Sequence, residues 1–146
     1  MNIVPQKTIQ LMSDQHAPEI ELLHAAFAAF NARDMDAALA LMTPDVVWPR
    51  AFKGGFVRGP KEVRAYWTEQ WNEINGHVEP VSFYSEENGR ILVDVHLVVR
   101  DLAGAVLIDE HVGQRFTFEN GLIQAMEICP PPSSTPESQP VQTSLP

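Results

Sequence analysis

Residues 90–129 read RILVDVHLVVRDLAGAVLIDEHVGQRFTFENGLIQAMEIC. The first part alternates strictly between an apolar face and a mixed face, which is the two-residue period of a β-strand with one buried side. Leu102–Ala105 has the composition of a turn, and Asn120–Gly121 is a strong two-residue hairpin signal. Together with a return strand around Val78–Tyr84, the stretch predicts an antiparallel meander with further strands at residues 90–100, 106–118 and 122–129.

The chain before this meander has helical spacing. Apolar residues recur at three- and four-residue intervals after Pro18, after a capping residue at Asp34 and after Pro60, which predicts three helices. We expect the second helix to stop at Thr43–Pro44 and the third near Asn75–Gly76. Helices that precede a meander predict an α+β fold, with the helices packed on one face of the sheet.

Two short segments separate the second and third helices. Asp45–Trp48 is rich in β-forming residues and is followed by a proline, so it reads as a short strand. Lys53–Pro60 is glycine-rich but lacks the spacing of a phosphate-binding loop. We expect the glycines to shape a turn or a lid over a pocket.

The length of 146 residues fits one domain. Six of the 12 prolines lie in the last 17 residues, beside Ser, Thr and Gln, so that segment has little to bury. The expected organisation is a partly ordered leader at 1–16, a folded body at 17–129 and a disordered Pro/Ser-rich tail at 130–146.

Charge and composition exclude several partners. The formal charge is −9 and the basic residues are scattered, which argues against binding to nucleic acid or to an anionic membrane surface. No apolar run approaches the ~20 residues that a membrane span needs, and the N-terminal residues lack the pattern of a secretory signal. Cys129 is the single cysteine, so no disulfide framework or cysteine zinc motif is expected, and the cytoplasm is the simplest compartment.

Three motifs carry a family resemblance: DMDAALALMTPDVVWP at residues 34–49, RGPKEVRAYWTEQW at 58–71 and FENGLI at 118–123. In this order they resemble the nuclear transport factor 2-like superfamily and, within it, the SnoaL-like proteins. VDVHLVVRDLAGAVLIDEHV is similar to small bacterial members of the group. The resemblance implies a cone-shaped, curved antiparallel sheet with three N-terminal helices on its concave face, an enclosed pocket and dimerisation through the sheet.

The resemblance leaves the activity open, because one fold hosts many functions. Ketosteroid isomerases of this superfamily use an aspartate directly before a proline as general base, and Trp48 stands at the corresponding position. Their oxyanion-binding acid corresponds to Gln114 or Gly113, neither of which ionises. Their tyrosine on the first helix has no counterpart, since that helix carries Phe27 and Phe30. Steroid isomerisation by the known route is therefore disfavoured.

One carboxylate shares the apolar face of the meander. A hairpin centred on Ala103–Gly104 pairs Leu97 with Glu110, so Glu110 and Gln114 would point into the apolar interior. A carboxylate in such a site is suited to act as a general acid or base, and Gln114 is the candidate polar group that orients the ligand. The alternative is that Glu110 lies at the rim, or pairs with an arginine such as Arg64, because charges are rarely buried unpaired.

The same register places His96 opposite His111 on the other face, near Asp94, Asp109 and Arg115. Two histidines and two carboxylates could ligate a metal, but this spacing is not diagnostic. A solvated sheet face has the same composition. The better functional interpretation is an interfacial network in a homodimer.

Aromatic residues gather around the first strand and the third helix. They are candidate pocket walls as well as candidate core residues: Trp48, Phe52, Tyr66, Trp67 and Phe116. Trp48 and Tyr66 each have a polar group with which to orient a ligand. The last strand is ambiguous, because an ideal two-residue turn points Glu127 inward whereas a bulge points Met126 inward.

The sequence therefore favours a homodimeric protein that binds a small apolar, possibly cyclic molecule without a metal or organic cofactor. If it is an enzyme, we expect an isomerase, cyclase or dehydratase that works by proton transfer. The alternative is a non-catalytic dimeric binding or interaction module with a filled pocket.

Overall fold

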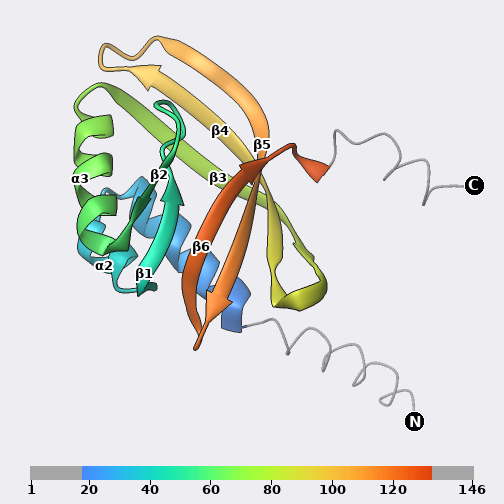
Figure 1. The fold of residues 1–146 in the computed structure, drawn as a ribbon. Helices are drawn as coiled ribbons and strands as arrows, with labels where there is room; N and C mark the ends of the chain where they lie inside the picture. Colours follow the sequence, from blue (N-terminus) through green and yellow to red (C-terminus); the bar gives the residue numbers. More distant parts are fainter. Residues whose placement is uncertain (1–17, 133–146) are drawn as a thin grey trace, which may run out of the picture.

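The computed structural model describes residues 18–132. A six-stranded curved sheet, in the order β2-β1-β6-β5-β4-β3, is accompanied by three helices that come early in the chain (Figure 1). The helices are residues 18–31, α2 (Met35–Leu39) and α3 (Gly59–Trp71). The strands are β1 (Met42–Pro49), β2 (Phe56–Arg58), β3 (Ile74–Ser85), β4 (Ile91–Asp101), β5 (Val106–Glu119) and β6 (Leu122–Cys129), with a 3₁₀ turn at Glu87–Gly89. The α+β prediction is confirmed. The expectations for residues 1–16 and for most of the proline-rich tail lie outside the described residues.

The antiparallel meander predicted from residues 78–129 is present, with β3, β4, β5 and β6 paired in succession. The sheet as a whole is mixed, however, because β1 pairs with β6 in parallel. β1 and β6 are far apart in the sequence, and β2, α3 and the strands β3, β4 and β5 lie between them. The expectation of an all-antiparallel sheet was therefore wrong at this one contact. No local turn signal predicts a pairing between strands so far apart.

Several element boundaries differ from those expected. Thr43–Pro44 does not end a helix but lies inside β1, where the pairing with β6 is irregular and β2 has not yet begun to pair. Pro44 therefore removes no ladder hydrogen bond that the regular sheet needs. Asn75–Gly76 does not follow the third helix but lies in β3, opposite Arg100 and Val99. Phe56–Arg58, expected in a loop, pairs with the end of β1.

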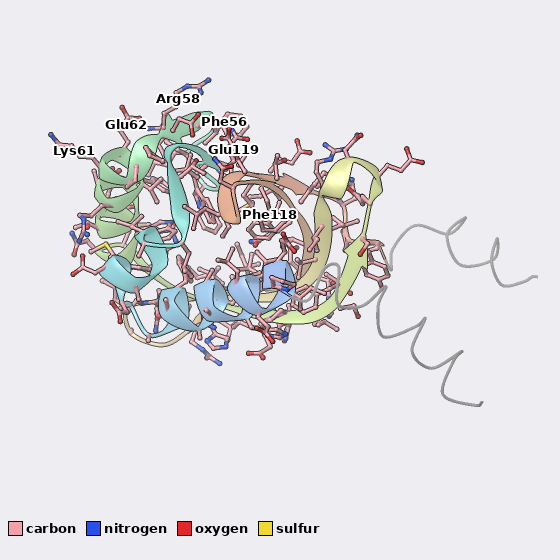
Figure 2. All side chains as sticks on the ribbon, turned by 90° about the horizontal axis from the view of Figure 1, so that it is seen from below. Phe56, Arg58, Lys61, Glu62, Phe118 and Glu119 are labelled. Atoms are coloured by element: carbon pink, nitrogen blue, oxygen red, sulfur yellow. The ribbon has the colours of Figure 1, made fainter. Side chains whose placement is uncertain are left out.

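The core lies between the helices and the concave face of the sheet. Viewed from below, the N-terminal helix, α3 and the strands surround the central side chains, while Arg58, Lys61 and Glu62 point outward at the start of α3 (Figure 2). Fully buried positions come from the alternating apolar face of β4, from β1 and β6, from α3 and from the N-terminal helix; they include Leu23, Val46, Val63, Ile91, Val93, Val95 and Ile123. The predicted apolar face of residues 90–100 is thus the inner face of the sheet.

The outer edge of β3 is covered by side chains from the end of the first helix. The Asn31 amide donates to the Val78 carbonyl at 2.7 Å and accepts from the Val78 N–H at 2.9 Å. Arg33 donates to the Gly76 carbonyl at 2.9 Å. An exposed strand edge invites pairing with another chain, so these contacts protect it. Within residues 18–132, no helix has both the length and the apolar character to cross a membrane.

Candidate functional site

A cavity of about 210 Å³ opens inside the cone, between the helices and the inner face of the sheet. Its walls are mostly apolar, with side chains from the N-terminal helix, α3 and the strands. All seven residues singled out from the sequence line it: Trp48, Phe52, Tyr66, Trp67, Glu110, Gln114 and Phe116. The exposed part of the lining, Ala51, Phe52, Glu110 and Ile128, is called the mouth below. The aromatic residues therefore do not fill the cone.

The aromatic wall is built by edge-to-face contacts. The Trp48 and Trp67 rings are 5.6 Å apart between centroids and nearly perpendicular, and the Trp67 and Phe30 rings are 5.2 Å apart. Trp48 also approaches Phe116 at 6.3 Å. Such pairs add about 0.5–1.5 kcal/mol each beyond area burial and fix the ring planes. The wall is therefore preorganised.

The loop between β1 and β2 is fastened to α3 beside the mouth. The Tyr66 hydroxyl accepts from the Phe52 N–H at 3.5 Å, and Lys53 pairs with Glu69 at 3.2 Å and with Glu73 at 3.5 Å. Burial raises the pKa of Tyr66, so the phenol keeps its proton at neutral pH. That proton has no acceptor among residues 18–132, and it is available to a ligand.

Glu110 occupies the predicted register, and it lies at the rim of the cavity. It lies directly opposite Leu97, as the hairpin at Ala103–Gly104 implies, and it lines the cavity. Its side chain is exposed at the mouth, so of the two alternatives drawn from the sequence the structure has the position at the rim and not the one in the interior. Arg64 pairs with Asp36 instead of with Glu110. No described residue makes a hydrogen bond or ion pair with the Glu110 carboxylate.

Two glutamines present amides to the cavity. Gln114 is half-buried opposite Ile128, and Gln70 on α3 is 9% exposed. Neither side chain makes a hydrogen bond within the described part of the chain. Gln70 was not singled out from the sequence. The signal was present, because Gln70 follows Tyr66 and Trp67 by four and three positions and shares their helix face.

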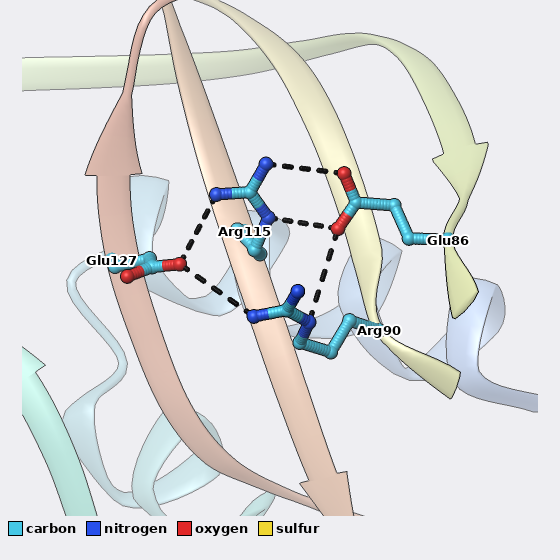
Figure 3. A network of polar contacts seen from close by, with 4 residues as sticks. All are labelled: Glu86, Arg90, Arg115 and Glu127. Atoms are coloured by element: carbon cyan, nitrogen blue, oxygen red, sulfur yellow. Dashed lines mark hydrogen bonds and ion pairs between the residues drawn. The ribbon is translucent and has the colours of Figure 1, made fainter. Parts of the chain in front are cut away.

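The last strand adopts the bulged alternative. The register shifts between Thr117 and Phe118, so Met126 pairs with Phe116 on the inner face and Glu127 points outward. There Arg115 bonds Glu127 at 3.1 Å and Glu86 through two nitrogens, at 2.8 and 3.1 Å, and Arg90 completes the network (Figure 3). Glu127 is thus outside the cavity.

The outer-face histidines form two crossed pairs. His96 contacts Asp109 at 2.7 Å, His111 contacts Asp94 at 2.8 Å, and the two imidazoles stack at 5.3 Å. Each histidine therefore has one carboxylate partner on the neighbouring strand. Within the described ranges, no group of three or more His, Cys, Asp or Glu side chains is arranged to hold a metal ion. The metal interpretation of this cluster is not supported.

Solved structures share this fold. TerC, co-crystallised with polyporic acid, is 24% identical with a TM-score of 0.69, covering 80% of this chain and 94% of that one. An NTF2-like protein of unknown function from Burkholderia pseudomallei is 25% identical with a TM-score of 0.67, covering 76% and 88%. Rv0760c from Mycobacterium tuberculosis, in complex with estradiol-17β-hemisuccinate, is 19% identical with a TM-score of 0.66, covering 76% and 92%.

No curated protein matches the chain. The sequence model of the SnoaL-like domain, by contrast, matches residues 23–126, which run from the N-terminal helix to the last strand. That span includes most of the cavity walls and the whole hairpin that carries Glu110. The chain therefore belongs to the SnoaL-like domain family, within the nuclear transport factor 2-like superfamily.

Proposed function

We propose that this protein binds a small, mostly apolar cyclic molecule in the cone cavity. The observation that carries the proposal is an open apolar cavity into which polar side chains project without partners: Gln70, Gln114 and Glu110. Ligand sites have this composition, with a few polar groups that orient the ligand on an apolar wall. The open cavity argues against the alternative of an interaction module with a filled pocket.

The volume sets the size of the ligand. A cavity of about 210 Å³ exceeds the roughly 150 Å³ apolar cavity that accepts benzene. One or two fused rings would fit, and a longer molecule would extend through the mouth. TerC and Rv0760c, which share the fold, were crystallised with small molecules, and this supports a ligand-binding role for the cavity here.

The proposed chemistry is proton transfer of the isomerase, cyclase or dehydratase kind. Glu110 is the only ionised side chain of the lining, and its carboxylate can take a proton from a ligand at the mouth. Gln114 and the Tyr66 phenol can orient the ligand by hydrogen bonds. Structures of the same fold from Xanthomonas campestris and Sinorhizobium meliloti are described as putative polyketide cyclases, which is compatible with this chemistry.

We further propose that two copies associate through the outer face of the sheet. Asp94, His96, His111 and Arg115 lie on that face, and the crossed His–Asp pairs and the arginine network supply charges of both signs for a self-complementary interface. Sedimentation analysis tests this proposal. With only one cysteine in the chain, the cytoplasm remains the proposed location.

The binding proposal is tested with 2-naphthol and two matched variants. Val112 lines the cavity, whereas Val98 is equally half-buried on the opposite face of the neighbouring strand. Val112→Trp should fill the cavity and abolish calorimetric binding, and Val98→Trp should leave binding intact. Naphthol at 100 times its Kd should stabilise the native protein by about 2.7 kcal/mol. Failure of naphthol to bind the native protein, or equal binding by both variants, would contradict the proposal.

Proton transfer is tested with 2-tetralone, a bicyclic ketone with acidic α-hydrogens. In D₂O, Glu110 would remove an α-proton and solvent would return a deuteron, so only the C–H bond changes. NMR should show exchange accelerated by the native protein and lost in Glu110→Gln, with tetralone binding retained. Exchange at the native rate in Glu110→Gln would remove Glu110 from the chemistry.

A further inference from the structure

The cavity lining carries negative charge only. No Lys, Arg or His is among the residues that line the cavity, and Glu110 is their only charged side chain. Seven of the lining residues are aromatic: Phe27, Phe30, Trp48, Phe52, Tyr66, Trp67 and Phe116. A ligand with a negative end group would therefore meet a carboxylate and the electron-rich faces of aromatic rings, with no cation to pair with.

The two cations on the loop between β1 and β2 do not reverse this balance. Lys53 lies on the loop beside the mouth, but Glu69 and Glu73 both pair with it, so the three side chains carry a net charge of −1. Hydrogen bonding and charge from these glutamates raise the pKa of Lys53 and keep it in the ion pair. Arg50 on the same loop donates its Nε hydrogen to the Gly54 carbonyl at 2.8 Å and keeps its positive charge, so that Lys53, Arg50, Glu69, Glu73 and Glu110 together carry a net charge of −1. The whole chain, at −9, adds a long-range field of the same sign as Glu110.

The unpartnered carboxylate of Glu110 makes the mouth prefer ligand groups that donate hydrogen bonds. An ionised carboxylate only accepts hydrogen bonds, so a ligand group that hydrogen-bonds to it is a donor. An ammonium donates with charge assistance and is also attracted by aromatic faces. A hydroxyl donates without charge, and a carboxylate or phosphate cannot donate at all.

We propose that the cavity is a charge filter that takes ligands with a cationic amine or an uncharged hydroxyl at the mouth and rejects carboxylates and phosphates. The proposal rests on ligand binding in the cavity and adds the charge class of the ligand. The expected order of affinity is ammonium, then hydroxyl, then carboxylate. An exposed ion pair contributes up to about 1 kcal/mol, which corresponds to about fivefold in Kd for each step of the series.

The test uses three probes of one skeleton: 2-naphthylmethylamine, 2-naphthylmethanol and 2-naphthoate. Their Kd values are measured by calorimetry at pH 7 on the native chain of 146 residues. We expect the amine to bind about fivefold tighter than the alcohol, and the alcohol about fivefold tighter than the carboxylate. Raising the salt from 0.15 to 1 M should compress the series, because it screens the exposed Glu110 charge.

Two variants test which side-chain charge sets the order of the three affinities. Glu110→Gln should bring the three Kd values together, whereas Asp109→Asn removes the same charge from the adjacent residue on the outer face and should preserve the order. Equal affinities on the native protein, tightest binding of naphthoate, or an unchanged order in Glu110→Gln would overturn the charge filter while leaving ligand binding intact. Binding of none of the probes would overturn both proposals.

Discussion

Leu97 and Glu110 lie directly opposite each other on β4 and β5, so a carboxylate and a leucine share one cross-strand position on the inner face of the sheet. Leu97 is half-buried and Glu110 is exposed, which places the boundary between the apolar interior and solvent at this pair. A carboxylate at that boundary keeps its hydration and still reaches a ligand in the cavity. This placement is the reason why we propose Glu110 both for recognition and for proton transfer.

Gly113 is predicted to be the least replaceable glycine of the sheet. A Cβ added there would lie 2.6 Å from the Pro130 carbonyl and 3.0 Å from that of Cys129, both of them backbone atoms. Gly113→Ala must therefore displace the chain after β6, which costs about 1–3 kcal/mol in overpacking. Gly76→Ala in β3 is the control, because nothing lies within 4 Å of its added Cβ. Urea denaturation should show a large loss of stability for Gly113→Ala only; equal losses would contradict the steric argument.

The sequence predicts the meander well because hairpin turns fix the register of strands that are neighbours in the chain. Leu97 opposite Glu110 and His96 opposite His111 both follow from the turn at Ala103–Gly104. The turn at Asn120–Gly121 did not decide the face of Glu127, since one bulged residue reverses the whole strand. A single extra residue leaves no clear signal in the composition.

The remaining errors concern contacts between distant segments. The parallel pairing of β1 with β6, and the short β2, depend on where the rest of the sheet places an edge, so no local pattern could reveal them. The depth of Glu110 stayed open between the interior and the rim for a related reason. Its face is set by local alternation, but its depth depends on whether helices cover that end of the sheet. Gln70 was missed because a polar residue within an apolar helical stripe resembles an ordinary position at its edge.

Removing the amide of Asn31 is predicted to destabilise the fold and to free the edge of β3. Asn31→Leu loses two hydrogen bonds to the Val78 backbone and leaves that N–H and C=O unpaired in a half-buried place, at a cost of about 1–3 kcal/mol. The freed edge should also promote association. Urea denaturation and light scattering test the two effects. Asn72→Leu, at an exposed amide that bonds no other described side chain, should change neither.

Acid is predicted to weaken the fold through Glu86. Hydrogen bonds from Arg115 hold the pKa of Glu86 below its usual value of 4.5. Because the folded-state pKa is the lower one, this stabilisation is present above pH 4.5 and is lost as the pH falls through the folded-state value. Glu86→Gln should therefore lower the stability at pH 7 by about 1 kcal/mol and flatten its decline between about pH 5 and 3.

The control for this pH dependence is Glu87→Gln, at the next residue. Glu87 is exposed and pairs with no cation in the described part of the chain. The urea midpoint, measured from pH 3 to pH 7, should decline in this variant as it does in the native protein. An acid decline in Glu86→Gln as steep as in the native protein would show that the contact with Arg115 does not govern acid stability.

Replacing Gln70 is predicted to weaken ligand binding without lowering the stability of the fold. Gln70 is 9% exposed, and its amide faces an apolar cavity without a partner among the described residues, so replacing it breaks no hydrogen bond within the described part of the fold. Leu has a similar size and no polar atoms. Gln70→Leu should therefore leave the free energy of unfolding unchanged or raise it by up to about 1 kcal/mol, while weakening 2-naphthol about fivefold through the loss of one neutral hydrogen bond.

The matched comparison is Thr68→Val, on the same helix but with an exposed side chain outside the cavity. That variant should leave naphthol binding unchanged. A stability gain together with an affinity loss in Gln70→Leu is the signature of a residue retained for its ligand, because a structural residue loses stability when it is replaced. If Gln70→Leu were strongly destabilised and bound naphthol normally, the amide would belong to the packing of α3 and not to the site.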